Sequence, residues 1–209
     1  MNTEVTRLFI TRHGETEWNL ERRVQGSRDS KLTKKGIMQA KKLGKYLADT
    51  PIDIIYTSTS GRAVDTTKLI TGKRSIDIVP MEQLQEMNMG IWEGLTFDEI
   101  GRKYEDMYDT FWQTPHLLKE HPGESFNSLK ERVLGALLKI IQANEGKNIL
   151  IVAHGIVLNV MMSYFEKRPL EKLFHEPHML STCLNEVEVQ GDNHNIIHYA
   201  ITDHYALDV

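Results

Sequence analysis

Two kinds of hydrophobic pattern alternate along the chain. Short, nearly continuous apolar runs rich in β-branched residues predict buried strands at about 5–11, 53–57, 75–79 and 148–152. Between these runs, apolar residues recur every three or four positions, which is the spacing of a helix with one buried face. Such helices are expected from a cap at Thr33 to about 48, at about 62–70, over 97–112, over 124–144, and after Gly155.

The last part of the chain has a strand pattern of its own. Two runs, at 184–190 and 195–201, flank the turn-forming residues Gly191, Asp192 and Asn193. This arrangement predicts a β-hairpin that closes the fold.

Strands that alternate with helices predict an α/β protein. We expect three layers, α/β/α, with a mostly parallel central sheet flanked by helices. The chain has 209 residues, which suffices for one sizeable core, and no linker or repeat divides it. A single domain over 1–209 is therefore expected, with a helical lid insertion at about 95–123 that ends at the Pro122-Gly123 break.

Composition excludes several classes of function. The formal net charge is −4, so a nucleic-acid binder that depends on phosphate neutralisation is not expected. The single cysteine, Cys183, allows no intramolecular disulfide and no cysteine-based zinc site, and it favours a reducing compartment. The first residues lack a signal-peptide pattern, and no apolar run is long enough to span a membrane. We expect a cytoplasmic protein with no membrane partner, and a homodimer remains open.

Reactive residues follow the predicted strands. The first strand ends in Arg12 and His13, the second is followed closely by Arg62, and a later one ends in His154. Ligands of open α/β sheets bind beyond the carboxyl ends of the strands, so these four side chains are expected to meet. A lone histidine at a strand end is usually structural, but here an apolar strand followed by His-Gly occurs twice.

Those residue types suit phosphoryl transfer. Guanidinium groups bind phosphate oxygens with two hydrogen bonds each. An imidazole among cations has a lowered pKa, so it stays neutral and nucleophilic near pH 7. A second imidazole can donate a hydrogen bond to phosphoryl oxygens in the transition state. The sequence therefore predicts a phosphohistidine intermediate.

The same residues lie in a recognisable order. From about residue 8 to 165 the chain resembles the histidine phosphatase superfamily, in the branch that contains the cofactor-dependent phosphoglycerate mutases. The matching blocks are Arg12-His13-Gly14-Glu15-Thr16, Asn19, Gln25-Gly26, Leu32-Thr33 with Gly36 and Gln39-Ala40, Ser58 with Arg62-Ala63, Glu86 ahead of Gly90-Ile91-Trp92-Glu93-Gly94, Gly123-Glu124-Ser125, and Val152-Ala153-His154-Gly155.

This resemblance implies a role for each matching residue. His13 would be the nucleophile, Glu86 the general acid, and Arg12, Arg62 and His154 would hold the phosphoryl group. Further phosphate-binding or cavity-lining residues implied in the same way are Thr16, Asn19, Gln25, Gly26 and Gly155. Proton donation suits the reaction, because an alkoxide leaving group must be protonated.

The resemblance favours a phosphatase of the broad-specificity subgroup. The segment between Glu86 and His154 is short and carries an aromatic stripe made of Phe97, Tyr104, Tyr108, Phe111 and Trp112. An aromatic lid suits organic leaving groups, although the stripe equally fits the core face of a helix. We expect a metal-independent phosphomonoesterase without cofactor, acting on a small phosphomonoester.

Three other interpretations remain open. A phosphoglycerate mutase would use the same chemistry but keep water from the phosphohistidine. A non-catalytic phospho-ligand binding module would be expected to lack the nucleophile or the acid. A metal hydrolase could use the His-Glu-Pro-His sequence at 175–178, which has no third ligand motif beside it.

Overall fold

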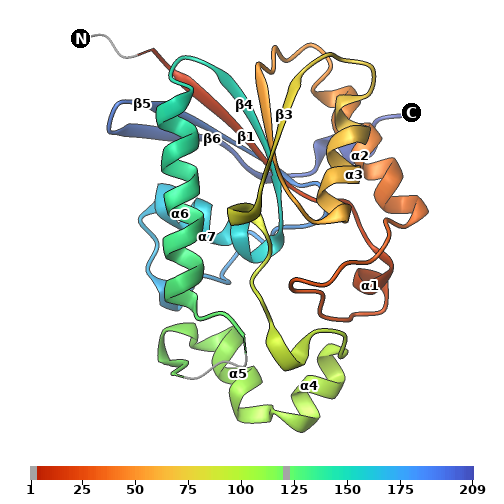
Figure 1. Cartoon of the computed structure of the whole chain (residues 1–209), viewed down its shortest axis with the longest axis vertical. Helices are drawn as coiled ribbons and strands as arrows, with labels where there is room; N and C mark the ends of the chain where they lie inside the picture. Colours follow the sequence, from red (N-terminus) through yellow and green to blue (C-terminus); the bar gives the residue numbers. More distant parts are fainter. Residues whose placement is uncertain (1–3, 120–122) are drawn as a thin grey trace.

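A six-stranded sheet forms the centre of the molecule (Figure 1). The computed structural model describes residues 4–119 and 123–209. The strands are β1 (Thr6–Arg12), β2 (Ile54–Ser58), β3 (Asp77–Met81), β4 (Asn148–Ala153), β5 (Leu184–Gln190) and β6 (Asn193–Ile201). Their order in the sheet is β3-β2-β4-β1-β5-β6. The first four are mutually parallel, and β5 is antiparallel to both of its neighbours. The expected mostly parallel sheet and the closing hairpin are thus confirmed.

Helices cover both faces of this sheet. The helices are α1 (Glu17–Leu20), α2 (Lys34–Tyr46), α3 (Gly61–Thr71), α4 (Phe97–Lys103), α5 (Glu105–Gln113), α6 (Phe126–Ala143) and α7 (Gly155–Glu166). Short 3-10 helices are η1 (Glu82–Leu84), η2 (Gly90–Trp92), η3 (Pro115–Leu117), η4 (Leu170–Lys172) and η5 (Asp203–Ala206). Among the described residues, none of these helices has the length and apolar character needed to cross a bilayer.

Side-chain alternation along the central strands explains the three layers. Leu8 and Ile10 of β1 belong to the core beneath α6 and α7, whereas Phe9 between them belongs to the core beneath α2 and α3. In β4, Ile149 and Leu150 divide between the two cores in the same way. Because successive residues of a strand point to opposite faces, a strand that is apolar throughout must be covered on both sides. The predicted α/β/α fold is confirmed.

The helix ends follow local capping chemistry. The hydroxyl of Thr33 accepts a hydrogen bond from the Gly36 amide at 2.9 Å, so the predicted cap is confirmed. The hydroxyl of Ser125 accepts one from Ser128, and α6 consequently begins at Phe126 rather than at Glu124. The predicted break at Pro122 lies outside the described residues.

The amphipathic segment 97–112 was expected to be one helix, and this expectation is wrong. It forms α4 and α5, which are separated at Tyr104, where φ is −138° and ψ is 41°. The break allows Tyr104, at the junction, and Phe111, on α5, to approach the buried Trp92, with ring centroids 6.5 and 5.4 Å from that indole. Tertiary packing of the aromatic rings therefore overrides a helical period that continues through the break. In Figure 1, α4 and α5 lie together at one end of the molecule.

Candidate active site

Three neighbouring strand ends meet at one edge of the sheet. In the register, Arg12 of β1 is opposite Ala153 of β4, and Val152 of β4 is opposite Thr57 of β2. The residues that follow these strands are therefore adjacent. The rings of His13 and His154 lie 5.3 Å apart between centroids, so the predicted meeting of the two histidines is confirmed.

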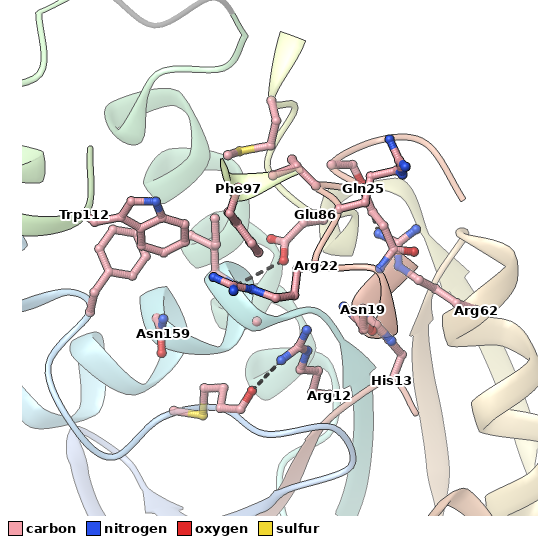
Figure 2. Close-up of a pocket in the computed structure, with 18 residues that line it drawn as sticks. Arg12, His13, Asn19, Arg22, Gln25, Arg62, Glu86, Phe97, Trp112 and Asn159 are labelled. Carbon is pink, nitrogen blue, oxygen red and sulfur yellow. Dashed lines mark hydrogen bonds between the residues drawn. The ribbon is translucent and has the colours of Figure 1, made fainter. Parts of the chain in front are cut away.

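A cavity of about 320 Å³ opens at this edge (Figure 2). Among the residues that the structure describes, its wall carries four arginines, Arg12, Arg22, Arg23 and Arg62, and a single carboxylate, Glu86. A chain of net charge −4 thus concentrates positive charge at one hollow. The cavity is suited to a small anion.

The geometry of His13 exposes one ring nitrogen to the cavity. Its main-chain amide donates to the Ala153 carbonyl at 3.0 Å, which extends the sheet register by one residue. Its Nδ1 donates to the carbonyl of Gly14 at 2.7 Å, since a carbonyl oxygen can only accept. The Nε2 atom therefore carries the lone pair. Burial, and then the charges of Arg62 and Arg12, hold the pKa of this imidazole well below its usual value.

His154 is fully buried behind the cavity wall. Its Nε2 lies 2.7 Å from the hydroxyl of Ser58, the last residue of β2. Burial, Arg62 and then His13 lower the pKa of this ring well below its usual value. Two neutral imidazoles consequently stand side by side at neutral pH, with Arg12 as a further nearby cation.

Arg12 and Arg62 are each held by acceptors of the protein itself. Arg62 donates to the Asp29 carboxylate at 2.9 Å and to the carbonyls of Arg28 and Gly26 at 2.6 and 2.9 Å. Arg12 donates to the Met179 carbonyl at 2.8 Å. These contacts fix both guanidinium groups before a ligand binds.

Three buried donor or acceptor atoms at this site lack a protein partner among the described residues. They are Nε of Arg12, Nε of Arg62 and Nδ1 of His154. Buried polar atoms are nearly always hydrogen-bonded, so such a cluster calls for an explanation. An oxyanion bound in the cavity would supply the missing hydrogen-bond partner.

The loop that follows β1 brings further polar groups to the cavity. Asn19 and Gln25 both line it. The Asn19 side-chain oxygen accepts from the amide and the hydroxyl of Thr16, at 3.1 and 3.0 Å, so its N–H donors are the groups left for a ligand. Thr16 itself is fully buried and does not line the cavity. The expectation that Thr16 binds the phosphate is therefore wrong. Thr16 instead caps α1 and orients Asn19.

Gly26 needs to be glycine for two reasons. Its φ of +56° is in the left-handed region, and a Cβ atom there would collide with the Glu93 carboxylate. Its carbonyl can then accept from Arg62 while its backbone lines the cavity.

Glu86 faces the amino end of α7. One carboxylate oxygen accepts from the Ile156 amide at 3.2 Å, and the other accepts from the Met87 amide at 3.0 Å. Gly155, the first residue of α7, lines the same cavity. The carboxyl group is thereby fixed at the cavity, close to the positive end of a helix.

The aromatic stripe divides between two environments. Phe97 and Trp112 line the cavity (Figure 2), and so does Phe174. The ring centroids of Phe174 and Trp112 are 4.7 Å apart. Tyr104, Tyr108 and Phe111 instead surround Trp92 in the core. The cavity-wall and core interpretations of this stripe are each correct for part of it.

Several residues of the site were not found from the sequence. Asn159 lines the cavity one helical turn after Gly155, and that spacing of four could have revealed it. Arg22 and Arg23 stand in a charged stretch that resembles any solvated surface. Asp29 lies 33 positions before Arg62, its partner, and no local pattern connects the two.

The His-Glu-Pro-His sequence at 175–178 carries no ligand cluster. His175 and His178 are exposed. Within residues 4–119 and 123–209, no group of three or more His, Cys, Asp or Glu side chains is arranged to hold a metal ion.

The protein is a three-layer α/β protein with two neutral histidines directly after parallel strands and two fixed arginines beside them. Proteins of this class are suited to bind a phosphoryl group. The chain belongs to the histidine phosphatase superfamily (branch 1), whose family model matches residues 8–202. This match confirms the resemblance seen in the sequence.

Individual relatives support the same assignment. The chain is 31% identical over 201 residues to the uncharacterized phosphatase PhoE of Bacillus subtilis, covering 96% of this chain and 97% of PhoE. It is 35% identical over 156 residues to the probable phosphoglycerate mutase GpmB of Salmonella arizonae, covering 75% and 73% of the two chains. The solved structure of Bacillus stearothermophilus YhfR is 43% identical, with a TM-score of 0.92 and coverage of 95% and 98%.

Proposed function

We propose that the protein is a phosphomonoesterase that transfers the phosphoryl group of a small organic phosphate to His13 and then to water. One observation carries the proposal. A neutral imidazole, with Nδ1 committed to the Gly14 carbonyl, presents its Nε2 lone pair to a cavity walled by Arg12 and Arg62. The similarity of the chain to PhoE, which is named as a phosphatase, also supports the proposal.

In the first step the substrate phosphoryl group occupies the arginine-lined hollow. Arg12, Arg62 and the Asn19 amide donate to its oxygens. The unpartnered Nδ1 of His154, whose ring centroid lies 5.3 Å from that of His13, is the further donor that we assign to them. The Nε2 lone pair of His13 attacks phosphorus, an N–P bond forms, and the bond from phosphorus to the ester oxygen breaks. Glu86 gives its proton to that oxygen, so an alcohol leaves rather than an alkoxide.

In the second step water replaces the alcohol. Glu86, now a carboxylate, accepts a proton from this water while the water oxygen attacks phosphorus. The N–P bond breaks, its electron pair returns to His13, and inorganic phosphate leaves. The two guanidinium groups stabilise charge in both transition states because they are already oriented.

Leaving groups would occupy the aromatic side of the cavity. Phe97, Trp112 and Phe174 form a wall that suits organic groups, with Asn159 as a polar contact. We accordingly propose that 1–209 is a single domain in which α4 and α5 act as the lid.

A phosphoglycerate mutase is the second candidate, and the similarity to GpmB favours it. Supplying 3-phosphoglycerate with and without 2,3-bisphosphoglycerate separates the two. Release of inorganic phosphate at the same rate in both cases supports the phosphatase, whereas bisphosphoglycerate-dependent formation of 2-phosphoglycerate supports the mutase.

Trapping of the phosphoenzyme tests the proposal. Rapid quenching with ³²P-labelled p-nitrophenyl phosphate should leave an acid-labile, base-stable label, and His13→Ala should remove it. His175→Ala, which changes an exposed histidine, is the matched control and should retain it. A label that survives His13→Ala would overturn the assignment. Saturable phosphate binding by the unmodified protein without turnover would instead support a non-catalytic binding module.

Metal independence and location are part of the same proposal. Arg12 and Arg62 supply the positive charge that metal ions provide in other phosphatases, so we expect activity to survive EDTA. The mild acidity and the single cysteine are consistent with the cytoplasm. A homodimer remains an expectation that light scattering can check.

A further inference from the structure

Arg132, on α6, reaches the irregular segment that carries Glu86. This segment runs from η1 to η2 and belongs to no strand or longer helix, so its carbonyls need other partners. Arg132 provides them: Nη1 donates to the carbonyls of Gln83 and Gln85, both at 2.8 Å, and Nη2 donates to the carbonyl of Glu86 at 3.1 Å.

Arg132 is itself held by a carboxylate. Its Nε and Nη2 atoms donate to the two oxygens of Glu124 at 2.7 and 2.8 Å. The Glu124 amide in turn donates to the Asn88 carbonyl at 2.8 Å. The side chains of Arg132 and Glu124 are only 24% and 14% exposed, so the pair is sheltered from water. Together the two residues brace the chain on both sides of Glu86.

We propose that Arg132, braced by Glu124, is a positioning residue that holds Glu86 over the cavity for proton transfer. The inference rests on the proposed role of Glu86 as general acid. The carboxyl group is steered from two sides: α7 holds one of its oxygens through the Ile156 amide, and Arg132 fixes the backbone that carries it. Displacement of a reacting group by about 1 Å can cost about 10²-fold in rate, so loss of either support matters.

Arginine is required for this task because of its geometry. Its planar group directs donors at three carbonyls and one carboxylate at once. The ammonium group of lysine has three donors on a flexible stem and cannot reproduce this set. Arg132→Lys should therefore restore function only in part.

Leaving-group dependence distinguishes positioning of the acid from general structural support. Arg132→Ala should lower kcat/KM about 10²-fold for glycerol 2-phosphate, whose alkoxide needs a proton. For p-nitrophenyl phosphate, whose leaving group needs none, the loss should be below about 5-fold. Arg132→Lys should fall between Arg132→Ala and the parent protein on glycerol 2-phosphate.

Arg74 offers a matched control. It also donates to three carbonyls, those of Leu47, Ile70 and Thr71, but at the far end of α3 from the cavity. Arg74→Ala should lower the melting temperature and leave the ratio of the two kcat/KM values unchanged.

A double variant completes the test. Glu86→Gln alone should show the same selective loss on glycerol 2-phosphate, and Arg132→Ala added to it should cost little more. If Glu86→Gln is selective but Arg132→Ala slows both substrates equally, or if their losses multiply, the positioning role is wrong and the proposed function stands. If Glu86→Gln itself slows both substrates equally, the acid assignment fails and the positioning role fails with it. Should Arg132→Ala not fold, Arg132→Lys and Glu124→Gln give the same comparison.

Discussion

At the scale of single residues, the site depends on keeping imidazoles neutral beside cations. Burial is the largest cause of the lowered pKa of both His13 and His154, and the arginines act in the same direction. Both effects disfavour the charged ring. A protonated His13 could not attack phosphorus, so burial of this ring serves nucleophilicity directly.

The lowered pKa of His13 predicts its titration. The ring of the free protein should remain neutral as the pH falls from 8 through 6.5, because protonation occurs only well below the usual value. NMR of ring-labelled histidine, assigned with His13→Gln, should show no change in the chemical shifts of His13 over that range. A midpoint near 6.5 would contradict the described environment.

The ion pair between Asp29 and Arg62 predicts a link between anion binding and stability. Asp29→Asn removes the carboxylate that pairs with Arg62, whose side chain is 1% exposed, while Asp29 is 41% exposed. We expect the free energy of unfolding to fall by about 1–2 kcal/mol in phosphate-free buffer, because the buried Arg62 loses its charged partner but keeps two carbonyl acceptors. Inorganic phosphate should recover part of this loss by placing an anion beside Arg62.

Urea denaturation with and without phosphate measures this effect. Asp65→Asn is the matched control. Asp65 lies on α3, the helix that carries Arg62, and pairs with Lys68 at an exposed position. If the two variants respond to phosphate equally, the link between Asp29 and the anion site is absent.

At the scale of elements, local patterns predicted the strands and most helices, while tertiary contacts determined the rest. The strands β1 and β4 each contain a continuous apolar run, and His13 and His154 follow the two strands directly, so both the sheet and its reactive ends were visible in the sequence. The break at Tyr104 was not visible in the sequence, because the helical spacing of the aromatic residues continues across it. The contact of Arg132 with the Glu86 carbonyl spans 46 positions, and only the folded topology brings the two together.

The proposed lid of α4 and α5 predicts a selective effect on leaving groups. Trp112 of α5 packs on Phe111 and Phe174, with centroids 4.9 and 4.7 Å apart, and lines the cavity. Trp112→Ala should raise KM for 1-naphthyl phosphate about 10-fold, because the aromatic leaving group loses apolar contact area. KM for glycerol 2-phosphate should change little.

Steady-state kinetics on both substrates check this expectation. Tyr164→Ala is a suitable control, since Tyr164 is a half-exposed aromatic residue on α7 that does not line the cavity. Equal increases in KM for both substrates would place the leaving group elsewhere.

At the scale of the whole molecule, charge is distributed unevenly. The formal net charge of the chain is −4, yet four arginines line the cavity. An anionic substrate is thus attracted at the cavity although the net charge of the protein is negative. The association rate with a phosphate ester should fall as ionic strength rises, since such attraction is screened over about 8–10 Å at 0.1–0.15 M salt.

Acid stability follows from histidines that are buried in their neutral form. His204, far from the cavity residues in sequence, is fully buried with its Nε2 atom 3.1 Å from the Thr182 hydroxyl. Burial lowers its pKa from 6.5 to about 4. Below pH 6.5 the unfolded chain therefore binds a proton that the folded protein does not, and stability falls as the pH drops from 6.5 towards 4.

This linkage gives a measurable slope. His204 should contribute a loss of about 2 kcal/mol in the free energy of unfolding between pH 7 and pH 5, and His13 and His154 add losses of the same sign. His204→Gln removes the titrating ring, so its stability should decline less steeply over that interval, whatever its stability at pH 7. Urea denaturation of both proteins at half-unit steps of pH measures the two slopes. Parallel curves would show that His204 is protonated equally in the folded and unfolded chains, and its burial would then have no part in acid unfolding.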